Sequence, residues 1–520
     1  MKKNSLRIIG FVLVVISFIT CKNVEYNTLE QILPDGLSTE INPYGKSPLT
    51  AQIKAHALQE MKWSYTIAGN SPVTRKSDNF SSNLIIDVIG LYANTENLVE
   101  IIFEDSKGKS FVDSIYIQTD TLPDAFPEIS ILKMNADAMQ TGMHLCDFAF
   151  GVKGKFHSTP FVFDNEGQIR WYLDLSSKEL WSAPMNFNAE GNLIFGSRYH
   201  LYEYDLMGNE INAWNVDPYF VHHEVIELPN GNIVAAVGKK NTFINNGEEL
   251  VSSGDDFIIE FNPSKEKIVN EWDLREVLDV DRPGMSKDVK TGDWYHMNAI
   301  EYSESDNTLI VSGKHQGVVK VDWDNNLKWI FAPHKGWGKS GKDGDGFETK
   351  NYLLTALDSN GEAYNDSIQM GYVSDTAFDW PWSQHAPVLD EDGDVFLFDN
   401  GLLRHFSPPP GYSRLVEYRI DDQAKTVQQI WDYGKERGTE LFSAIISDVD
   451  LLSNSNILGT FGFLRSNDKH YGRIIELSYP DNNEIFEAEL IFKDAFGNGY
   501  LEWGQIDILY RSERIDFNQK

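Results

Sequence analysis

The stretch Asp293–Val321 reads DWYHMNAIEYSESDNTLIVSGKHQGVVKV and predicts two β-strands joined by a short polar turn. A polar residue, His296, opens the first strand, which is otherwise apolar. Because side chains alternate along a strand, His296 and Asn298 are expected on the same face. Lys314, in the second strand, is expected to share that face, and its neighbour His315 must then point away. A histidine, an amide and a cation at one strand end indicate a site rather than a packing surface.

The position of His296 recurs at two other places in the chain. His222 opens HHEVIELPNGNIVAAV and His385 opens HAPVLDEDGDVFLF. In all three units an aliphatic residue follows four positions later, then an acid, then a turn and a second strand. One register shared by repeated units places equivalent side chains at equivalent points of the fold, so the three histidines are candidates for a common site. His223, one residue off this register, is expected to point sideways and to support the site.

The composition describes a large acidic protein. The chain has 520 residues, of which 41% are hydrophobic and 12% aromatic, enough for a substantial core and more than one domain. Lys and Arg number 45 against 78 Asp and Glu, which gives a formal net charge of −33. This charge argues against nucleic acids and anionic membrane surfaces as partners. An anionic substrate would need a local cationic pocket.

Residues 1–20 have the pattern of a secretory signal peptide, with basic residues followed by the apolar run Ile8–Thr20. The run is too short to span a bilayer as a helix. Cys21 follows directly, so we predict that it carries lipid, with an ordinary signal peptide and an incidental cysteine as the alternative. The protein is therefore expected to be an exported periplasmic or cell-surface lipoprotein, held at the membrane only through this anchor. Beyond Cys21 the sequence has only Cys146, so no intrachain disulfide is expected.

The remaining chain is predicted to be all-β. Residues 21–48 are polar with scattered Pro and Gly and are expected to form a lipidated tether. Residues 49–125 contain short alternating strands separated by turns, the pattern of a small N-terminal β-sandwich domain. Residues 126–520 contain hairpins with turn residues at their tips, each followed by a second strand pair with an aromatic-rich edge. Four strands repeated about six times predict a six-bladed β-propeller, with long loops that account for the irregular spacing.

In a propeller the innermost strands line the central channel, so His222, His296 and His385 would meet at one mouth. Three histidines and a water also suit a metal-dependent hydrolase or lyase, which stays open as an alternative. Lys314 on the same face would oppose a dication, so no metal is predicted. A propeller that binds a ligand without catalysis is the second alternative. We interpret Asp390–Asp394 as a hairpin turn rather than a calcium loop.

Several long motifs resemble the bacterial aryl-sulfate sulfotransferases. They are HHEVIELPNGNI, DWYHMNAIEY, SGKHQ, QHAPVLDEDGDVFLFDNG and SRLVEYRIDDQAKTVQQIWDYGKERG, and the similarity covers most of residues 45–480. The resemblance implies an exported six-bladed propeller with an N-terminal β-sandwich. It also implies transfer of a sulfuryl group from a phenolic sulfate donor to a phenol acceptor, without phosphoadenosine phosphosulfate and with no cofactor, through a sulfated histidine.

The same resemblance assigns roles to residues singled out above. His385, in the QHA motif, matches the family's nucleophile, whose attack on sulfur gives a covalent intermediate and ping-pong kinetics. His296 and His222 match the other channel histidines, and one of them would protonate the leaving phenolate and deprotonate the acceptor. Asn298 would donate a hydrogen bond to a sulfuryl oxygen. Lys314 would provide the positive charge beside the reacting group.

Lys314 is also where the sequence departs from the family pattern, which usually has arginine before His-Gln. Lysine keeps the positive charge and loses the planar fork that grips two oxygens at once. A further polar ligand is expected near 443–447. A homodimer is an open alternative to a monomer.

Overall fold

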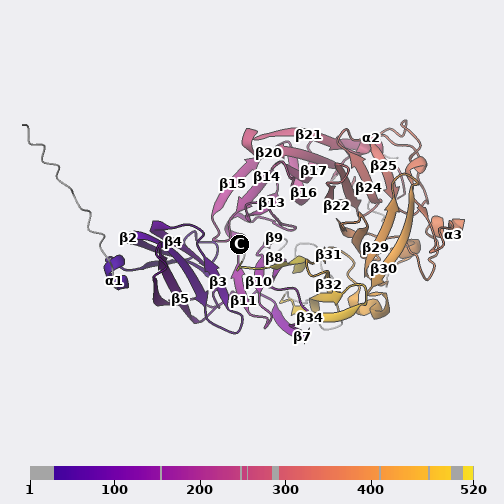
Figure 1. Cartoon of the computed structure of the whole chain (residues 1–520). Helices are drawn as coiled ribbons and strands as arrows, with labels where there is room; N and C mark the ends of the chain where they lie inside the picture. Colours follow the sequence, from indigo (N-terminus) through magenta and orange to yellow (C-terminus); the bar gives the residue numbers. More distant parts are fainter. Residues whose placement is uncertain are drawn as a thin grey trace, which may run out of the picture.

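A computed structural model of the chain describes residues 28–152, 155–245, 249–254, 256–283, 292–408, 411–466, 469–493 and 507–518. The predicted signal peptide and Cys21 lie outside the described residues. Regular structure is nearly all β, as predicted, and falls into an N-terminal region and a larger second region (Figure 1). The α-helices of the described chain are single turns: α1 (Leu29–Ile32), α2 (Leu274–Val277) and α3 (Asp366–Gln369). Within the described residues, no helix combines the length and apolar character needed to cross a membrane.

The N-terminal region is built around one strand of 18 residues, whereas the sequence pattern predicted short strands. Its strands are β1 (Ser38–Ile41), β2 (Thr50–Ile67), β3 (Val73–Lys76), β4 (Ser81–Ile89), β5 (Glu96–Asp105) and β6 (Ser110–Gln118). The first half of β2 pairs with β1 and β4, and its second half pairs with β3 and β5. The pairing with β4 shifts in register between His56 and Met61, where β2 changes partners. Alternate residues of β5 are buried, as expected for a strand with one face on a core.

Part of the predicted tether is ordered structure. Ile32 in α1 and the following Leu33 are both buried in the core of the N-terminal region. β1 also lies in this segment and pairs with β2. A tether is therefore the wrong description of residues 28–48. Ile32 and Leu33 anchor this segment although its overall composition is polar.

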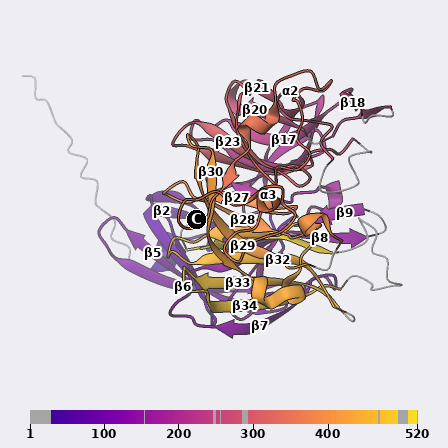
Figure 2. The same cartoon turned by 90° about the vertical axis from the view of Figure 1, so that its right-hand side faces the viewer.

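The second region contains six sheets of four or five strands in the described part of the chain, and these follow one another in chain order around a common centre (Figure 1); Figure 2 shows the same region from the side. The first is β8 (Met143–Val152), β9 (Lys155–Ser158), β10 (Phe161–Phe163), β11 (Ile169–Tyr172) and β35 (Ile508–Ile515), and the second is β12 (Asn186–Phe187), β13 (Leu193–Ser197), β14 (His200–Tyr204) and β15 (Glu210–Asn215). The third is β16 (Tyr219–Glu227), β17 (Ile233–Lys239), β20 (Phe257–Asn262) and β21 (Lys267–Asp273), and the fourth is β22 (Met297–Ser303), β23 (Thr308–Gly313), β24 (Gly317–Asp322) and β25 (Leu327–Phe331). The fifth is β26 (Thr355–Ala356), β27 (His385–Leu389), β28 (Val395–Asp399), β29 (Arg414–Asp421) and β30 (Thr426–Tyr433), and the sixth is β7 (Glu128–Met134), β31 (Asp448–Leu451), β32 (Ile457–Arg465), β33 (His470–Ser478) and β34 (Asn483–Ile491). A separate hairpin, β18 (Phe243–Asn245) and β19 (Leu250–Ser252), extends from the third sheet.

Strands from opposite ends of this region share sheets. β35 pairs with β8, so the last strand of the chain completes the first sheet. β7 pairs with β34, so the earliest strand of the region completes the sixth sheet. These two exchanges join the beginning and the end of the region by backbone hydrogen bonds.

Tryptophans on the outermost strands tie consecutive sheets together. The indole nitrogen of Trp272 on β21 donates to the backbone oxygen of Asp322 at 2.8 Å. Trp329 on β25 donates to the Asp422 carboxylate at 2.8 Å, and Trp431 on β30 to the Asn482 side chain at 2.6 Å. The aromatic edges in the sequence are thus ring faces packed between sheets, with each indole N–H paired as a buried donor requires.

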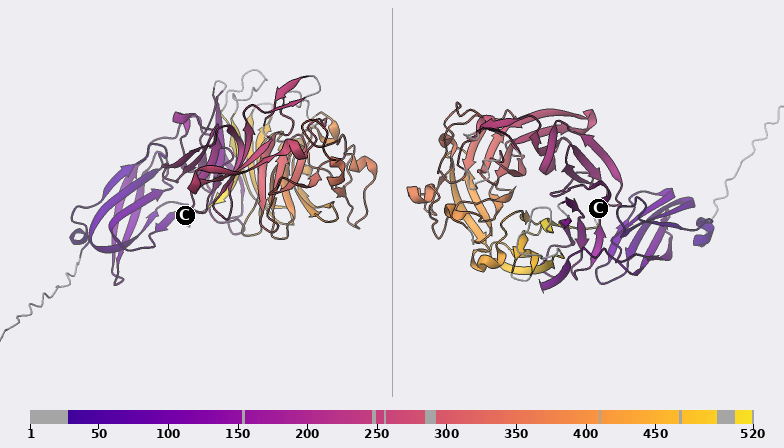
Figure 3. Two further views of the ribbon diagram at one scale, coloured as in Figure 1. Left: turned by 90° about the horizontal axis from the view of Figure 1, so that it is seen from above. Right: turned by 180° about the vertical axis from the view of Figure 1, so that it is seen from behind.

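The N-terminal region lies beside the first sheet (Figure 3), and Arg170 joins the two. Its guanidinium is fully buried and donates to the backbone oxygens of Gly90 at 2.9 Å and Ser71 at 2.7 Å. Asp164 pairs with it at 3.0 Å, and the ring of Tyr92 stacks 3.5 Å from its central carbon. Because a buried charge is costly without partners, this set of contacts fixes the contact between the two regions.

Candidate functional site

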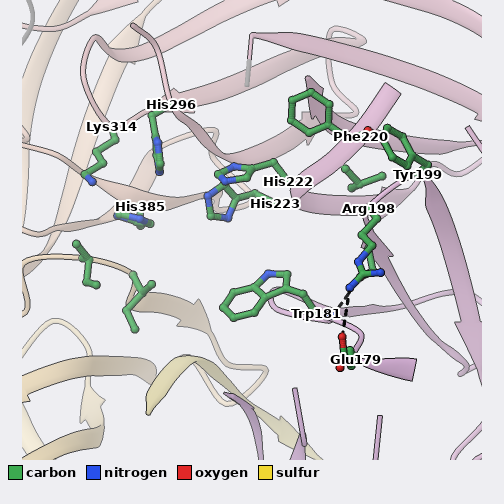
Figure 4. Close-up of a pocket in the computed structure, with 14 residues that line it drawn as sticks. Glu179, Trp181, Arg198, Tyr199, Phe220, His222, His223, His296, Lys314 and His385 are labelled. Atoms are coloured by element: carbon green, nitrogen blue, oxygen red, sulfur yellow. Dashed lines mark hydrogen bonds and ion pairs between the residues drawn. The ribbon is translucent and has the colours of Figure 1, made fainter. Parts of the chain in front are cut away.

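A cavity of about 710 Å³ opens where β16, β22 and β27 begin (Figure 4). These are end strands of three consecutive sheets, and each contacts the next. Five residues predicted for the site line this cavity: His222, His223, His296, Lys314 and His385. The structure brings these residues together, and their chemical roles stay predictions.

The rings of His222, His223 and His296 form a compact cluster. Ring centroids lie 4.1 Å apart for His222 and His223, and 5.3 Å apart for His222 and His296. The pairing of β16 with β17 shifts in register between Val221 and Val225. Such a bulge interrupts the alternation of side chains, so both consecutive histidines reach the cavity. His223 therefore lines the cavity itself, whereas its position in the sequence pattern predicted a side chain that points sideways.

His296 is held in a backbone conformation that side-chain-bearing residues seldom adopt, with φ at 52°. The amide of Lys314 donates to its backbone oxygen at 3.0 Å. His385 opens β27 just before Ala386, whose φ is 50°. Backbone strain of this kind persists where surrounding contacts fix it and is concentrated at functional sites.

Because of this backbone conformation, Asn298 does not point in the predicted direction. The register of β22 against β23 shifts between Met297 and Ala299, so strict alternation from His296 onward fails. Asn298 is buried, does not line the cavity, and donates its amide to the backbone oxygen of Gln384 at 2.8 Å. Its observed contact is with the segment that carries His385, whereas the sequence predicted a face shared with His296.

The His385 ring has a defined tautomer. Its Nδ1 lies 2.7 Å from the side-chain oxygen of Asn400. The Asn400 amide nitrogen donates to the backbone oxygens of Ser443 and Ile446, each at 2.8 Å, which fixes the orientation of the side chain. Nδ1 must therefore carry the hydrogen, and Nε2 keeps its lone pair. The sequence analysis missed Asn400, because the Asp-Asn-Gly in which it lies has the pattern of a turn.

Burial keeps two of these histidines neutral. It lowers the pKa of His385 to about 3, and the positive charges of Lys314 and His296 act in the same direction while the Asn400 hydrogen bond opposes them. Burial likewise lowers the pKa of His222 to about 4, with Asp293 opposing and Lys314 adding. At neutral pH the His385 ring is therefore an uncharged base with an available lone pair.

His296 has a carboxylate partner. Its Nδ1 lies 2.9 Å from Asp293 Oδ2, and the Nε2 of buried His315 lies 3.6 Å from the same oxygen. Burial alone would raise the pKa of Asp293, but hydrogen bonds and charge from the two histidines outweigh it and hold that pKa below its ordinary value. Donor atoms of these three residues lie within 4.8 Å of one another, so they could hold a metal ion. This set differs from His222, His296 and His385, the three histidines predicted for the metal alternative.

The rest of the cavity lining is largely apolar. It includes Trp181, Tyr199 and Phe220 (Figure 4) as well as Ile445 and Ile446, with an ion pair between Arg198 and Glu179 beside them. Apolar and aromatic walls with a few polar groups suit a flat ring bearing a polar substituent.

The polar ligand expected near 443–447 is not among the residues that line the cavity. Ser443 and Ser447 are buried, and their hydroxyls lie 2.8 Å apart and bond one another. The segment instead presents Ile445 and Ile446 to the cavity.

Tyr510, on β35, is a neighbour of the site that the sequence analysis missed. Its hydroxyl lies 2.9 Å from His223 Nδ1 and 3.4 Å from the backbone oxygen of Asn298. Burial raises the pKa of Tyr510, so the hydroxyl stays neutral. Tyr510 therefore orients His223, and the last strand contributes to the site.

Residues 128–500 match the model of the arylsulfotransferase (ASST) family, and residues 38–120 match the arylsulfotransferase Ig-like domain. The chain belongs to the arylsulfotransferase family, and its N-terminal region is an Ig-like domain. It is 28% identical over 550 residues to the arylsulfate sulfotransferase AssT of Escherichia coli, a match that covers 87% of this chain and 89% of the relative. It is 29% identical over 548 residues to the AssT of Lelliottia amnigena, with 88% of each chain covered. A gluconolactonase from Xanthomonas campestris aligns with 71% of this chain and 96% of its own at 9% identity, and its TM-score of 0.32 is too low to support an argument.

Proposed function

We propose that this protein transfers a sulfuryl group from a phenolic sulfate ester to a phenol acceptor through a sulfated His385. The observation that carries the proposal is the buried, neutral His385 ring at the cavity wall, with Nδ1 bound to Asn400. Membership of the arylsulfotransferase family supports the reaction class. The residues used need no cofactor.

In the first half of the proposed reaction, the lone pair on His385 Nε2 forms a bond to sulfur. The bond between sulfur and the aryl oxygen breaks, and the leaving oxygen takes a proton from a cavity histidine that enters the step as imidazolium, His222 or His296, and leaves it as neutral imidazole. The sulfated ring is positively charged, and the Asn400 oxygen accepts its Nδ1–H. In the second half a phenol gives its proton to the same histidine and attacks sulfur. The nitrogen–sulfur bond breaks and its electrons return to His385, which gives ping-pong kinetics.

The remaining residues of the cavity fit this proposal. Lys314 lines the same cavity as the histidines and would lie beside the sulfuryl oxygens, whose negative charge a fixed cation stabilises during transfer. The apolar wall at Trp181 and Phe220 would hold the aromatic ring of the donor and then that of the acceptor. One cavity can serve both phenols in turn because the sulfuryl group stays on the protein between them.

We further propose that the six sheets are the blades of a closed six-bladed propeller. Their arrangement in chain order, and the pairing of β35 with β8 and of β7 with β34, support this architecture. Exchange of strands between the first and last sheets is a means of closing a ring of sheets.

The alternative is a metal-dependent hydrolase or lyase, which the cluster of Asp293, His296 and His315 favours. One assay separates the two and also tests the non-catalytic ligand-binding alternative. Purified protein is given a chromogenic aryl sulfate with and without a phenol acceptor, before and after chelation. Metal-independent colour release that is stimulated by acceptor, together with sulfated acceptor, supports the proposal. Water-dependent release lost on chelation supports the hydrolase, and no release supports the binding protein.

We also propose, on the sequence alone, an exported lipoprotein anchored through Cys21. The variant Cys21→Ser should be released from the membrane fraction or remain unprocessed. A variant that fractionates and migrates like the natural protein would leave a plain secreted enzyme. Sizing chromatography of the purified protein tests for a homodimer.

A further inference from the structure

We propose that Asp293 is a positioning residue that makes His296, and not His222, the group that exchanges protons with the phenols. The inference rests on the proposed sulfuryl transfer, which leaves the two histidines open. The contact between Asp293 Oδ2 and His296 Nδ1 at 2.9 Å carries it.

The Asp293 carboxylate at Nδ1 fixes the tautomer of the His296 ring. Because an ionised carboxylate only accepts hydrogen bonds, Nδ1 carries the hydrogen and Nε2 is left as the exchanging atom. His296 lines the cavity together with His385 and Lys314 (Figure 4). The nitrogen that loses and regains a proton is therefore Nε2, in the same cavity as the nucleophile.

The carboxylate also matches the charge that appears during the reaction. His296 becomes an imidazolium when it accepts a phenol proton, and the charge-assisted bond to Asp293 then strengthens. In the reverse role the imidazolium donates from Nε2 to the leaving oxygen. The titratable groups facing Asp293 are His296, His315 and His222. The contacts with His296 and His315 favour its ionised form.

The segment that carries Asp293 and His296 is fixed on several sides. Trp294 donates its indole N–H to Asp256 at 2.9 Å, and its backbone oxygen accepts from Gln316 at 3.1 Å. The hydroxyl of Tyr295 donates to the backbone oxygen of Val311 at 3.0 Å. These neighbours hold residues 293–296 in place before substrate binds, which is what a positioning role requires.

The test is the dependence of rate on the leaving phenol, measured in full-length Asp293→Asn. An activated nitrophenyl sulfate leaves without a proton, whereas an unactivated aryl sulfate needs one. The variant should lower kcat/KM for the unactivated donor by roughly 10²-fold, the scale of general acid catalysis, and for the nitrophenyl donor by less than about threefold. The matched control Asp394→Asn removes a buried carboxylate outside the cavity and should leave both rates unchanged.

Four outcomes contradict the inference. An equal loss for both donors indicates a merely structural role, and an unchanged rate for both excludes any role. A leaving-group effect in His222→Asn but not in Asp293→Asn assigns the proton to His222. A stoichiometric metal that the natural protein holds and Asp293→Asn lacks, and whose removal abolishes activity, makes Asp293 a ligand. The proposed function fails separately, when the natural protein given donor alone forms no adduct at His385.

Discussion

His385 and His296 line the same cavity, yet their Nδ1 atoms bind chemically different partners. His385 faces the amide oxygen of Asn400 at 2.7 Å, and His296 faces the carboxylate of Asp293 at 2.9 Å. An amide orients a ring without supplying charge, so burial dominates and the pKa of His385 falls to about 3. A carboxylate orients a ring and also adds a negative charge beside it. In the proposed mechanism one residue type therefore serves as nucleophile and as proton carrier, because the partner behind the ring differs.

Replacing His385 is expected to have the largest effect on activity, because it removes one of the two histidines compared. His385→Ala or His385→Asn should lower kcat by roughly 10⁴-fold or more, because no other group forms the covalent bond. Natural protein given donor alone should accumulate an acid-labile adduct at His385, detected by mass spectrometry at neutral or alkaline pH. Thermal unfolding checks that the variant is folded. Full activity in the variant, or an adduct on another residue, would refute the assignment of His385 as the nucleophile.

Lys314 bears on the His385 side of the comparison, because its charge lowers the pKa of His385, as it does that of His222. Lys314→Ala should lower kcat/KM by roughly 10²–10³-fold, the scale of losing one donor to a developing anion. Lys314→Arg should keep or raise activity, since its fork can bind two oxygens. Both are measured on one aryl sulfate at fixed pH and salt. An alanine variant with unchanged kinetics would remove Lys314 from the site.

Asn400→Asp makes the two histidine environments alike. A carboxylate beside His385 should raise the pKa of the ring, so that adduct formation falls by about tenfold for each pH unit below that new pKa. The two bonds that Asn400 donates to backbone oxygens are also lost, so the melting temperature should drop. The measurement is the rate of adduct formation between pH 5 and 8. A purely structural loss would lower this rate by the same factor at every pH and would not shift its pH dependence. A profile of unchanged shape would contradict the role of the amide.

The smallest expected effect concerns stability and pH. The pKa of His385 is about 3 in the folded protein against 6.5 as its ordinary value, so below pH 6.5 the unfolded chain binds the extra proton. Stability from this residue is therefore lost as pH falls from 7 to 5, by about 2 kcal/mol. Between pH 7 and pH 5, the free energy of unfolding of His385→Asn should therefore fall by about 2 kcal/mol less than that of the natural protein. Denaturant unfolding at both pH values measures it, and equal losses in the two proteins would show that the ring is not buried as neutral imidazole.

The cavity residues that could be predicted from the sequence are mainly those that occupy the same position in repeated units. His222, His296 and His385 share a register, and a shared register converts to a shared position once the sheets are arranged around a centre. Their partners do not repeat. Asp293 lies before its strand and Asn400 after another strand, in segments with the composition of ordinary turns. Which turn residue reaches which ring depends on packing between sheets, and a single sequence does not encode that in a readable pattern.

Local irregularities explain the remaining differences. Asn298 was assigned by strict alternation, which the positive φ of His296 and the register shift after Met297 interrupt. In the N-terminal region, short strands were predicted, yet β2 runs through from Thr50 to Ile67 and changes partners between His56 and Met61. Alternation predicts a strand's face reliably only while its hydrogen-bond ladder is regular.

Strand β35 has a consequence for when the protein becomes active. It pairs with β8, about 360 positions earlier in the chain, and it carries Tyr510 against His223. Closing so long a loop is entropically costly, and contacts between remote segments form late in folding. His385 is therefore synthesised before the strand that completes its surroundings, and the contact between Tyr510 and His223 can form only when β35 pairs with β8. Folding of the site is thus expected to depend on this C-terminal strand.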